Sequence, residues 1–315
     1  MTVAQYVYGP VCSRRLGRSL GIDLVPFKTC SYDCIYCQLG RTTNLTLERR
    51  EYVPIAQLLE ELRQKLATSS KPDYITLAGS GEPTLNSGLG DLIEDIKGIT
   101  TIPVAVLTNG SLLWMPEVRK ELMGADLVVP SLDAGDEALF RHVNRPHKDL
   151  DFKQMIDGLT IFCREFPGRV WLEVFLLAGI TGILHEVEKI AALVKRIQPE
   201  RVQLNTVVRP PAEDFAFAVP MARMEGFTGL FPVQAEVITE KAMGEETLGA
   251  PEQETVDQGI LSLVSRRPCP LTEIAAVLAM PPNEALKHLQ GLMKSHLVSA
   301  VSKNGRLYYQ TVRPS

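Results

Sequence analysis

Several features are missing from this 315-residue sequence, and each absence narrows the class of protein. No run of eighteen apolar residues occurs, so we expect no membrane-spanning helix and no membrane partner. The first ten residues lack the basic-then-apolar pattern of a signal peptide. The formal net charge of −4 excludes a globally basic nucleic-acid binder but is compatible with a local basic patch. These absences predict a globular protein.

Cysteine is scarce as well, with six residues in the chain. Cys12, Cys163 and Cys269 are scattered, whereas the other three lie together. This distribution does not resemble a disulfide framework, so we expect a reducing, cytoplasmic location.

The clustered residues Cys30, Cys34 and Cys37 have C-x3-C-x2-C spacing and follow an apolar run over 21–26. Thiolates on one tight loop suit an iron–sulfur cluster, zinc or copper(I). A structural zinc site prefers four ligands, and no second Cys pair or Cys/His pair follows. Three cysteines leave one corner of a four-iron cluster without a protein ligand, where a cosubstrate can bind.

Apolar runs alternate with amphipathic segments between residues 21 and 208. We expect strands at 21–26, 74–78, 104–107, 125–132, 170–177 and 201–208, and helices at 54–67, 89–96, 117–123, 151–166 and 185–197. This alternation predicts an α/β fold with parallel strands, and six units suit a partial (β/α)6 barrel. The site of such a fold lies at the carboxyl ends of its strands.

Polar residues occur at or near these strand ends. They are Ser80, Gly81, Glu82, Asn109, Ser131, Asp133, Glu173 and Asn205. Glycine lets backbone approach a ligand closely, and an Asn amide can pair with sugar hydroxyls or simply end a strand. Glu173 lies in an apolar strand, so it must face the barrel interior or pair with an arginine. Arg14, Arg15 and Arg18 form either a solvated face or a clamp for phosphate or carboxylate.

Residues 246–315 differ in character from residues 1–245, so we expect a small second domain. We expect helices at 256–264, 270–278 (capped by Thr272) and 282–295, then a hairpin over 297–312 with an Asn-Gly turn at Asn304. Three helices and a β wing resemble a winged helix, a module that binds nucleic acid or docks a protein.

The cysteine motif, with Tyr36 before its last cysteine, resembles the signature of the radical S-adenosylmethionine (SAM) superfamily. The resemblance implies that Cys30, Cys34 and Cys37 hold one [4Fe-4S] cluster whose fourth iron is chelated by SAM. It implies reductive cleavage of SAM to a 5′-deoxyadenosyl radical that abstracts hydrogen from a substrate. A reductase, flavodoxin or ferredoxin would supply the electron.

The resemblance also implies roles for the polar strand ends. The segment 80–82 resembles the family's GGE motif, with Ser80 in place of its first glycine, and would hold the methionine end of SAM with Gly81 and Glu82. Tyr36 would lie near the adenine, and Asn109, Ser131 or Asp133 would contact the ribose or carboxylate. Glu173 and Asn205 would face SAM or substrate.

The segment 9–17 and the cysteine loop resemble an iron–sulfur oxidoreductase subgroup related to the wybutosine-synthesis (4-demethylwyosine synthase-like) enzymes of tRNA. That relation makes a modified RNA base one candidate substrate. Two alternatives stay open: an activase that makes a radical on a partner protein, and an iron–sulfur sensor or electron-transfer protein whose cluster acts through the winged helix.

Overall fold

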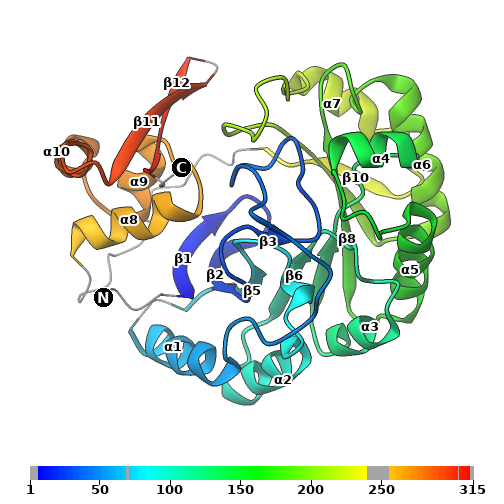
Figure 1. The fold of residues 1–315 in the computed structure, drawn as a ribbon, viewed down its shortest axis with the longest axis horizontal. Coiled ribbons are helices and arrows are strands. Elements are labelled where there is room, and N and C mark those ends of the chain that lie inside the picture. Colours follow the sequence, from blue (N-terminus) through cyan, green and yellow to red (C-terminus); the bar gives the residue numbers. More distant parts are fainter. Residues whose placement is uncertain (1–5, 69–70, 240–254, 304, 313–315) are drawn as a thin grey trace.

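The computed structural model describes residues 6–68, 71–239, 255–303 and 305–312 (Figure 1). Its centre is an eight-stranded sheet in the order β1-β2-β5-β6-β7-β8-β9-β10. These strands are β1 (Val7–Ser13), β2 (Gly17–Asp23), β5 (Tyr74–Ala78), β6 (Val104–Thr108), β7 (Leu127–Pro130), β8 (Arg169–Leu176), β9 (Arg201–Thr206) and β10 (Gln234–Val237). All neighbours from β2 to β10 are parallel, and only β1 is antiparallel within this sheet.

Helices cover the convex face of this curved sheet (Figure 1). They are α1 (Ile55–Thr68), α2 (Leu89–Ile99), α3 (Pro116–Leu122), α4 (Glu137–Val143), α5 (Phe152–Glu165), α6 (Leu184–Ile197) and α7 (Met221–Thr228). Val104, Val106 and Val128 belong to the main hydrophobic core, whereas their strand neighbours Ala105 and Leu127 belong to a second cluster. Both sheet faces are therefore buried, as a parallel sheet requires.

The parallel α/β architecture predicted from the alternating pattern is present, and the predicted strands and helices appear close to their expected bounds. The structure also contains elements that the pattern did not predict, among them β1, α4, α7 and β10. The segment before residue 21 forms β1 and the start of β2, which begins at Gly17 rather than Gly21. The polar stretch around His142 includes α4, and the weakly periodic segment after residue 210 contains β10, a seventh parallel strand.

The turn between β1 and β2 enters the concave side of the sheet. Leu16 at this turn is buried against Leu127, Val129 and Trp171. The N-terminal hairpin therefore fills one end of the barrel interior and carries Arg14 and Arg15 inward with it.

The C-terminal module consists of α8 (Val256–Arg266), α9 (Leu271–Val277), α10 (Pro282–Lys294) and the hairpin of β11 (Val298–Lys303) and β12 (Arg306–Thr311). It has its own hydrophobic core. The predicted cap of α9 is wrong: Pro270 precedes the helix and makes no side-chain cap. Asn304 and the expected boundary at 245/246 lie outside the described residues.

The C-terminal module lies beside β1 in Figure 1 and contacts both ends of the barrel chain. On one side, Arg266 forms an ion pair with Asp23 at 3.2 Å, and its guanidinium lies over the Tyr8 ring. On the other side, Glu273 of the module forms an ion pair with Arg209 of the barrel at 2.8 Å, and the Tyr308 hydroxyl donates a hydrogen bond to the Val208 carbonyl. No helix in the described parts of the chain is long and apolar enough to cross a bilayer.

Candidate active site

The three clustered cysteines lie on one loop that follows β2. Cys30 ends the short strand β3 (Thr29–Cys30), which pairs with β4 (Asn44–Leu45). The Cys37 amide donates to the Cys34 carbonyl at 3.1 Å, which gives the C-x2-C segment a tight turn. Ile35 is fully buried, and its amide donates to the Val143 carbonyl. The loop is thus attached to the barrel between its second and third cysteines.

Each of the three sulfur atoms accepts a hydrogen bond from a different side chain. The Lys28 ammonium donates to Cys37 Sγ at 3.2 Å, Asn109 Nδ2 to Cys30 Sγ at 3.6 Å, and Asn144 Nδ2 to Cys34 Sγ at 3.5 Å. Of these donors only Asn109 was predicted to belong to the site. Lys28 adjoins the motif, but no sequence signal marks Asn144, which comes from the end of α4.

The donor set fits a four-iron cluster better than a single ion. Burial raises the pKa of Cys30 to about 12, with Glu82 adding to the effect, so a thiolate there needs a strong positive partner such as iron. Within the described residues, no three His, Cys, Asp or Glu side chains are placed to share one metal ion. A cluster has no such requirement, because each cysteine ligates a different iron. The residues present therefore fit the cluster.

The turn 79–82 packs directly on the cysteine loop. A Cβ at Gly81 would stand 1.9 Å from the Thr29 carbonyl oxygen, so only glycine fits there. Two backbone hydrogen bonds join the segments: Lys28 N to Ser80 O at 2.6 Å and Glu82 N to Thr29 O at 3.1 Å. The small residues predicted to approach a ligand thus also permit the close approach of the two loops.

The Glu82 carboxylate is buried and held by four hydrogen bonds. Oε1 accepts from the Thr84 amide, the Thr84 hydroxyl and the Thr108 hydroxyl, while Oε2 accepts from the Asn109 amide at 2.7 Å. Burial raises the pKa of Glu82, and these hydrogen bonds oppose that rise. Asn109 also donates to the Ser31 hydroxyl at 2.8 Å. The ends of β5 and β6 are therefore coupled at this carboxylate and the cysteine loop.

Ser131 and Asp133, both expected as contacts, face different surroundings. Ser131 lines the central cavity described below. Asp133 instead accepts hydrogen bonds from the Tyr36 hydroxyl and from Asn144 Nδ2, the latter at 2.7 Å. Burial raises the pKa of Asp133 to about 6. The Tyr36 ring stacks on Phe175 at 4.0 Å between centroids, so Asp133 and Phe175 fix the position of Tyr36.

Glu173 meets both descriptions given by the sequence, because it borders the central cavity and also pairs with an arginine. Its Oε1 accepts from Arg15 at 2.5 Å and from Asn205 Nδ2 at 2.8 Å. Burial works to raise the pKa of Glu173, but Arg15 and the hydrogen bonds hold it below its usual value. Asn205 Oδ1 accepts from Arg14 at 3.3 Å. Both amide atoms of Asn205 are therefore engaged by the protein.

A central cavity of about 360 Å³ collects several of these residues. Cys30, Gly81, Glu82, Asn109, Ser131 and Glu173 line it. The opposite wall comes from α8 and the residue after it: Ser262, Leu263, Arg266 and Arg267. Sequence reasoning missed this wall, since no local pattern indicates where the C-terminal module docks. Cys34, Cys37, Tyr36, Ser80, Asp133 and Asn205 do not line the cavity.

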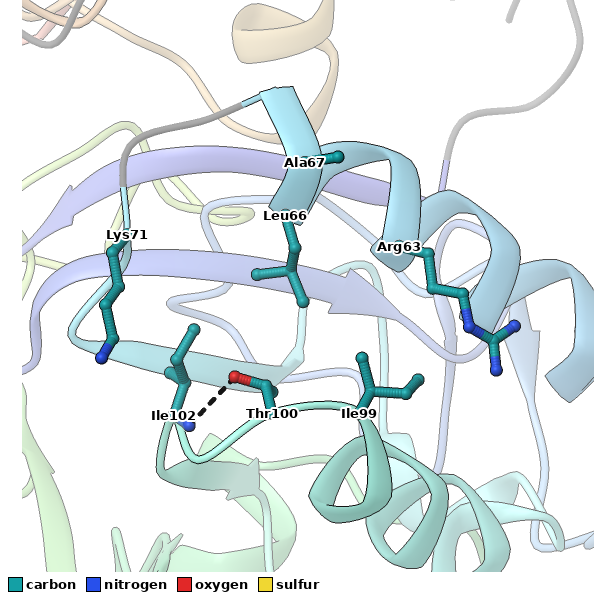
Figure 2. A pocket seen from close by; sticks show the side chains of 7 residues that line it. All are labelled: Arg63, Leu66, Ala67, Lys71, Ile99, Thr100 and Ile102. Carbon is teal, nitrogen blue, oxygen red and sulfur yellow. Dashed lines mark hydrogen bonds between the residues drawn. The ribbon is translucent and has the colours of Figure 1, made fainter.

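A second pocket, of about 450 Å³, lies at the other end of the barrel and lacks these chemical groups (Figure 2). Leu66, Ile99 and Ile102 form its apolar part, and Arg63 and Lys71 stand at its two sides. The Thr100 hydroxyl accepts from the Ile102 amide at 3.2 Å. The central cavity, with its cysteine and carboxylates, is therefore the candidate active site.

Comparisons with known proteins identify the family of this chain. A protein named "GTPase Obg" from Brachyspira hyodysenteriae is 40% identical over 96% of this chain, but the chain spans only 45% of that protein. A protein of family UPF0026 from Methanocaldococcus jannaschii is 33% identical over 98% of this chain and 96% of its own length. The S-adenosyl-L-methionine-dependent tRNA 4-demethylwyosine synthase of Pyrococcus horikoshii is 27% identical over 45% of this chain and 40% of its own.

Among solved structures, a radical SAM methyltransferase from Sphaerobacter thermophilus matches with a TM-score of 0.53 and 17% identity, covering 70% of this chain and 65% of its own. This likeness shows the fold. The model of the radical SAM superfamily matches residues 24–197, from the cysteine loop to the end of α6. The chain therefore belongs to the radical SAM superfamily, whose enzymes use S-adenosylmethionine and a [4Fe-4S] cluster.

Proposed function

We propose that this enzyme cleaves SAM reductively at a cluster held by Cys30, Cys34 and Cys37, and that its substrate is an RNA base. One observation carries the proposal: a cysteine of the cluster loop lines the same cavity as Glu82 and Asn109 at the ends of two adjacent strands. The cluster and SAM, when bound, supply a 5′-deoxyadenosyl radical that takes a hydrogen atom from the substrate.

In this proposal, residues that line the cavity bind and orient SAM and the substrate, together with Ser80, Asp133 and Asn205, which do not line it. Glu82, with Ser80 and Gly81, receives the ammonium of the methionine end, because its carboxylate is fixed by four donors and Oε2 accepts only one of them. Asn109 and Ser131 contact the ribose or the SAM carboxylate. Asp133 and Asn205 do not contact SAM directly but position other side chains. Asp133 positions Tyr36 beside the adenine, and Asn205 positions Glu173.

The proposal of an RNA substrate draws on the similarity to the tRNA-modifying enzyme of Pyrococcus horikoshii. The C-terminal module supports it through its architecture, since three helices followed by a two-stranded hairpin suit a winged helix that contacts nucleic acid. We propose residues 246–315 as this second domain and a reductase, flavodoxin or ferredoxin as the electron donor. We also propose that the enzyme is cytoplasmic.

The test is anaerobic cluster reconstitution followed by reduction with dithionite in the presence of SAM. We expect wild-type protein to form 5′-deoxyadenosine and Cys34→Ala to form none. Bulk tRNA should then raise the rate, and a deuterated base should pass deuterium into the 5′-deoxyadenosine. A four-iron cluster that never cleaves SAM would favour the sensor or electron-transfer alternative, and zinc in place of iron would refute both.

A further inference from the structure

Four arginines gather beside the central cavity, in the interface between the barrel and the C-terminal module. Arg14 and Arg15 come from the turn of the N-terminal hairpin, Arg209 follows β9, and Arg267 follows α8. Two carboxylates face them: Glu173 pairs with Arg15 at 2.5 Å, and Glu273 pairs with both Arg209 and Arg267, at 2.8 and 2.6 Å. Four guanidinium groups thus share two carboxylates.

Arg14 carries one of the two positive charges that these pairs leave unbalanced. In the parts of the chain that the structure describes, it forms no ion pair, and its side chain donates to the neutral amide oxygen of Asn205 at 3.3 Å. Burial lowers the pKa of Arg14 to about 10, and repulsion from Arg209, Arg15 and Arg267 adds to this effect. Arg14 is still charged at neutral pH, so the protein holds a half-buried cation among other cations.

Arg209 is a second indication that a bound anion belongs here, because one of its hydrogen-bond donors has no acceptor among the described residues. Its Nη2 reaches Glu273, but its Nε is buried and has no hydrogen-bond acceptor among the described residues. A buried donor without an acceptor is costly, as is an unpaired buried charge. The two excess positive charges and the unpaired Nε donor of Arg209 would therefore be stabilised by a bound anion.

We propose that Arg14, Arg209 and Arg267 form a binding site for a phosphate group of the substrate, with Arg15 fixed beside them by Glu173. The proposal rests on the proposed function, since it names a chemical feature of the molecule that this enzyme acts on. Phosphate matches the forked donors of arginine and carries up to two negative charges. Arg267 and Glu173 line the central cavity, so a phosphate bound here lies at the edge of the space that Cys30 also lines.

The site exists only when the C-terminal module is docked. Arg267 belongs to that module, and Glu273 in α9 holds Arg209 of the barrel. The barrel alone supplies Arg14, Arg15 and Arg209. The module therefore acts as a wall that contributes to substrate specificity, whatever its outer surface contacts.

The test is titration calorimetry of inorganic phosphate into the full-length, cluster-loaded chain. We expect Arg14→Gln to weaken phosphate binding at least about tenfold, the value of one charged hydrogen bond. Arg18→Gln is the matched control, because Arg18 lies four residues away on the same hairpin and pairs instead with Asp73. It should bind phosphate as wild type does. A cooperative thermal transition of each variant would show that it is folded, and the midpoint of Arg14→Gln should be at least that of the phosphate-free wild type, because the variant lacks an unpaired half-buried charge.

Two further ligands distinguish the sources of the phosphate. A nucleoside 5′-monophosphate tests a free nucleotide, and a short RNA without terminal phosphates tests the RNA backbone. Binding of either ligand that depends on Arg14 supports the site, and the ligand that binds identifies the source of the phosphate.

Three results would overturn the proposal: no phosphate binding by wild type at millimolar concentration, equal binding by Arg14→Gln, or loss of phosphate binding at saturating SAM. The last would assign the arginines to the SAM carboxylate. Failure of the proposed function looks different, since wild-type protein would then bind phosphate without ever forming 5′-deoxyadenosine.

Discussion

Gly81→Ala should disrupt the cysteine loop, because a methyl group at this position has no room. Its Cβ would lie 1.9 Å from the Thr29 carbonyl oxygen, while ordinary contact begins at 3.4 Å. The two segments would have to separate by about 1.5 Å, an overpacking that costs about 1–3 kcal/mol. Such a separation also breaks the two backbone hydrogen bonds, Lys28 N to Ser80 O and Glu82 N to Thr29 O, at about 1 kcal/mol or more each.

The free energy of unfolding should therefore fall by about 4 kcal/mol in total, which lowers the thermal midpoint by roughly 10 °C for a chain of this size. Iron bound per chain after anaerobic reconstitution should fall as well. Gly98→Ala is the matched control, because nothing lies within 4 Å of its added Cβ on α2, and it should stabilise the protein by up to about 1 kcal/mol. A Gly81→Ala protein with wild-type midpoint and iron content would refute this reasoning.

Two other substitutions test the contacts around the site. Asn144→Ala removes the hydrogen-bond donor that buried Asp133 and Cys34 Sγ share. We expect the free energy of unfolding to fall by about 1–3 kcal/mol and the cluster potential in a redox titration to become more negative. An unchanged potential would count against the Cys34 contact. Arg266→Leu leaves buried Asp23 without its ion-pair partner and should cost about 3 kcal/mol by thermal unfolding. Adding Asp23→Asn should restore most of that loss, and no rescue would contradict the pairing.

The barrel could be predicted because its signals are local. Buried strands such as Val104–Thr108 are continuous apolar runs, and α5 and α6 show clear helical periods. The cysteine spacing likewise placed a cluster loop at the end of β2. The N-terminal hairpin could not be recognised in this way, because the sequence of β1 contains Gly9 and Pro10, which usually mark turns.

Several residues that the sequence singled out line the central cavity, and the parts of its surroundings that were missed depend on tertiary contacts. Nothing near Arg14 or Arg15 in the sequence shows that the turn enters the barrel, where Leu16 packs on Trp171. Nothing near Arg267 shows that it reaches the cavity wall, because docking of the C-terminal module joins residues more than 200 positions apart, as Arg266 and Asp23 show. Asn144 joins the site for the same reason.

The central claim is that the cluster of Cys30, Cys34 and Cys37 binds SAM through the cavity that Glu82 and Asn109 line. Electron paramagnetic resonance of the reduced, reconstituted protein tests this most directly. We predict that adding SAM changes the spectrum of the reduced cluster and that Glu82→Gln requires a higher SAM concentration for the same change. A spectrum that stays the same at saturating SAM would contradict the account.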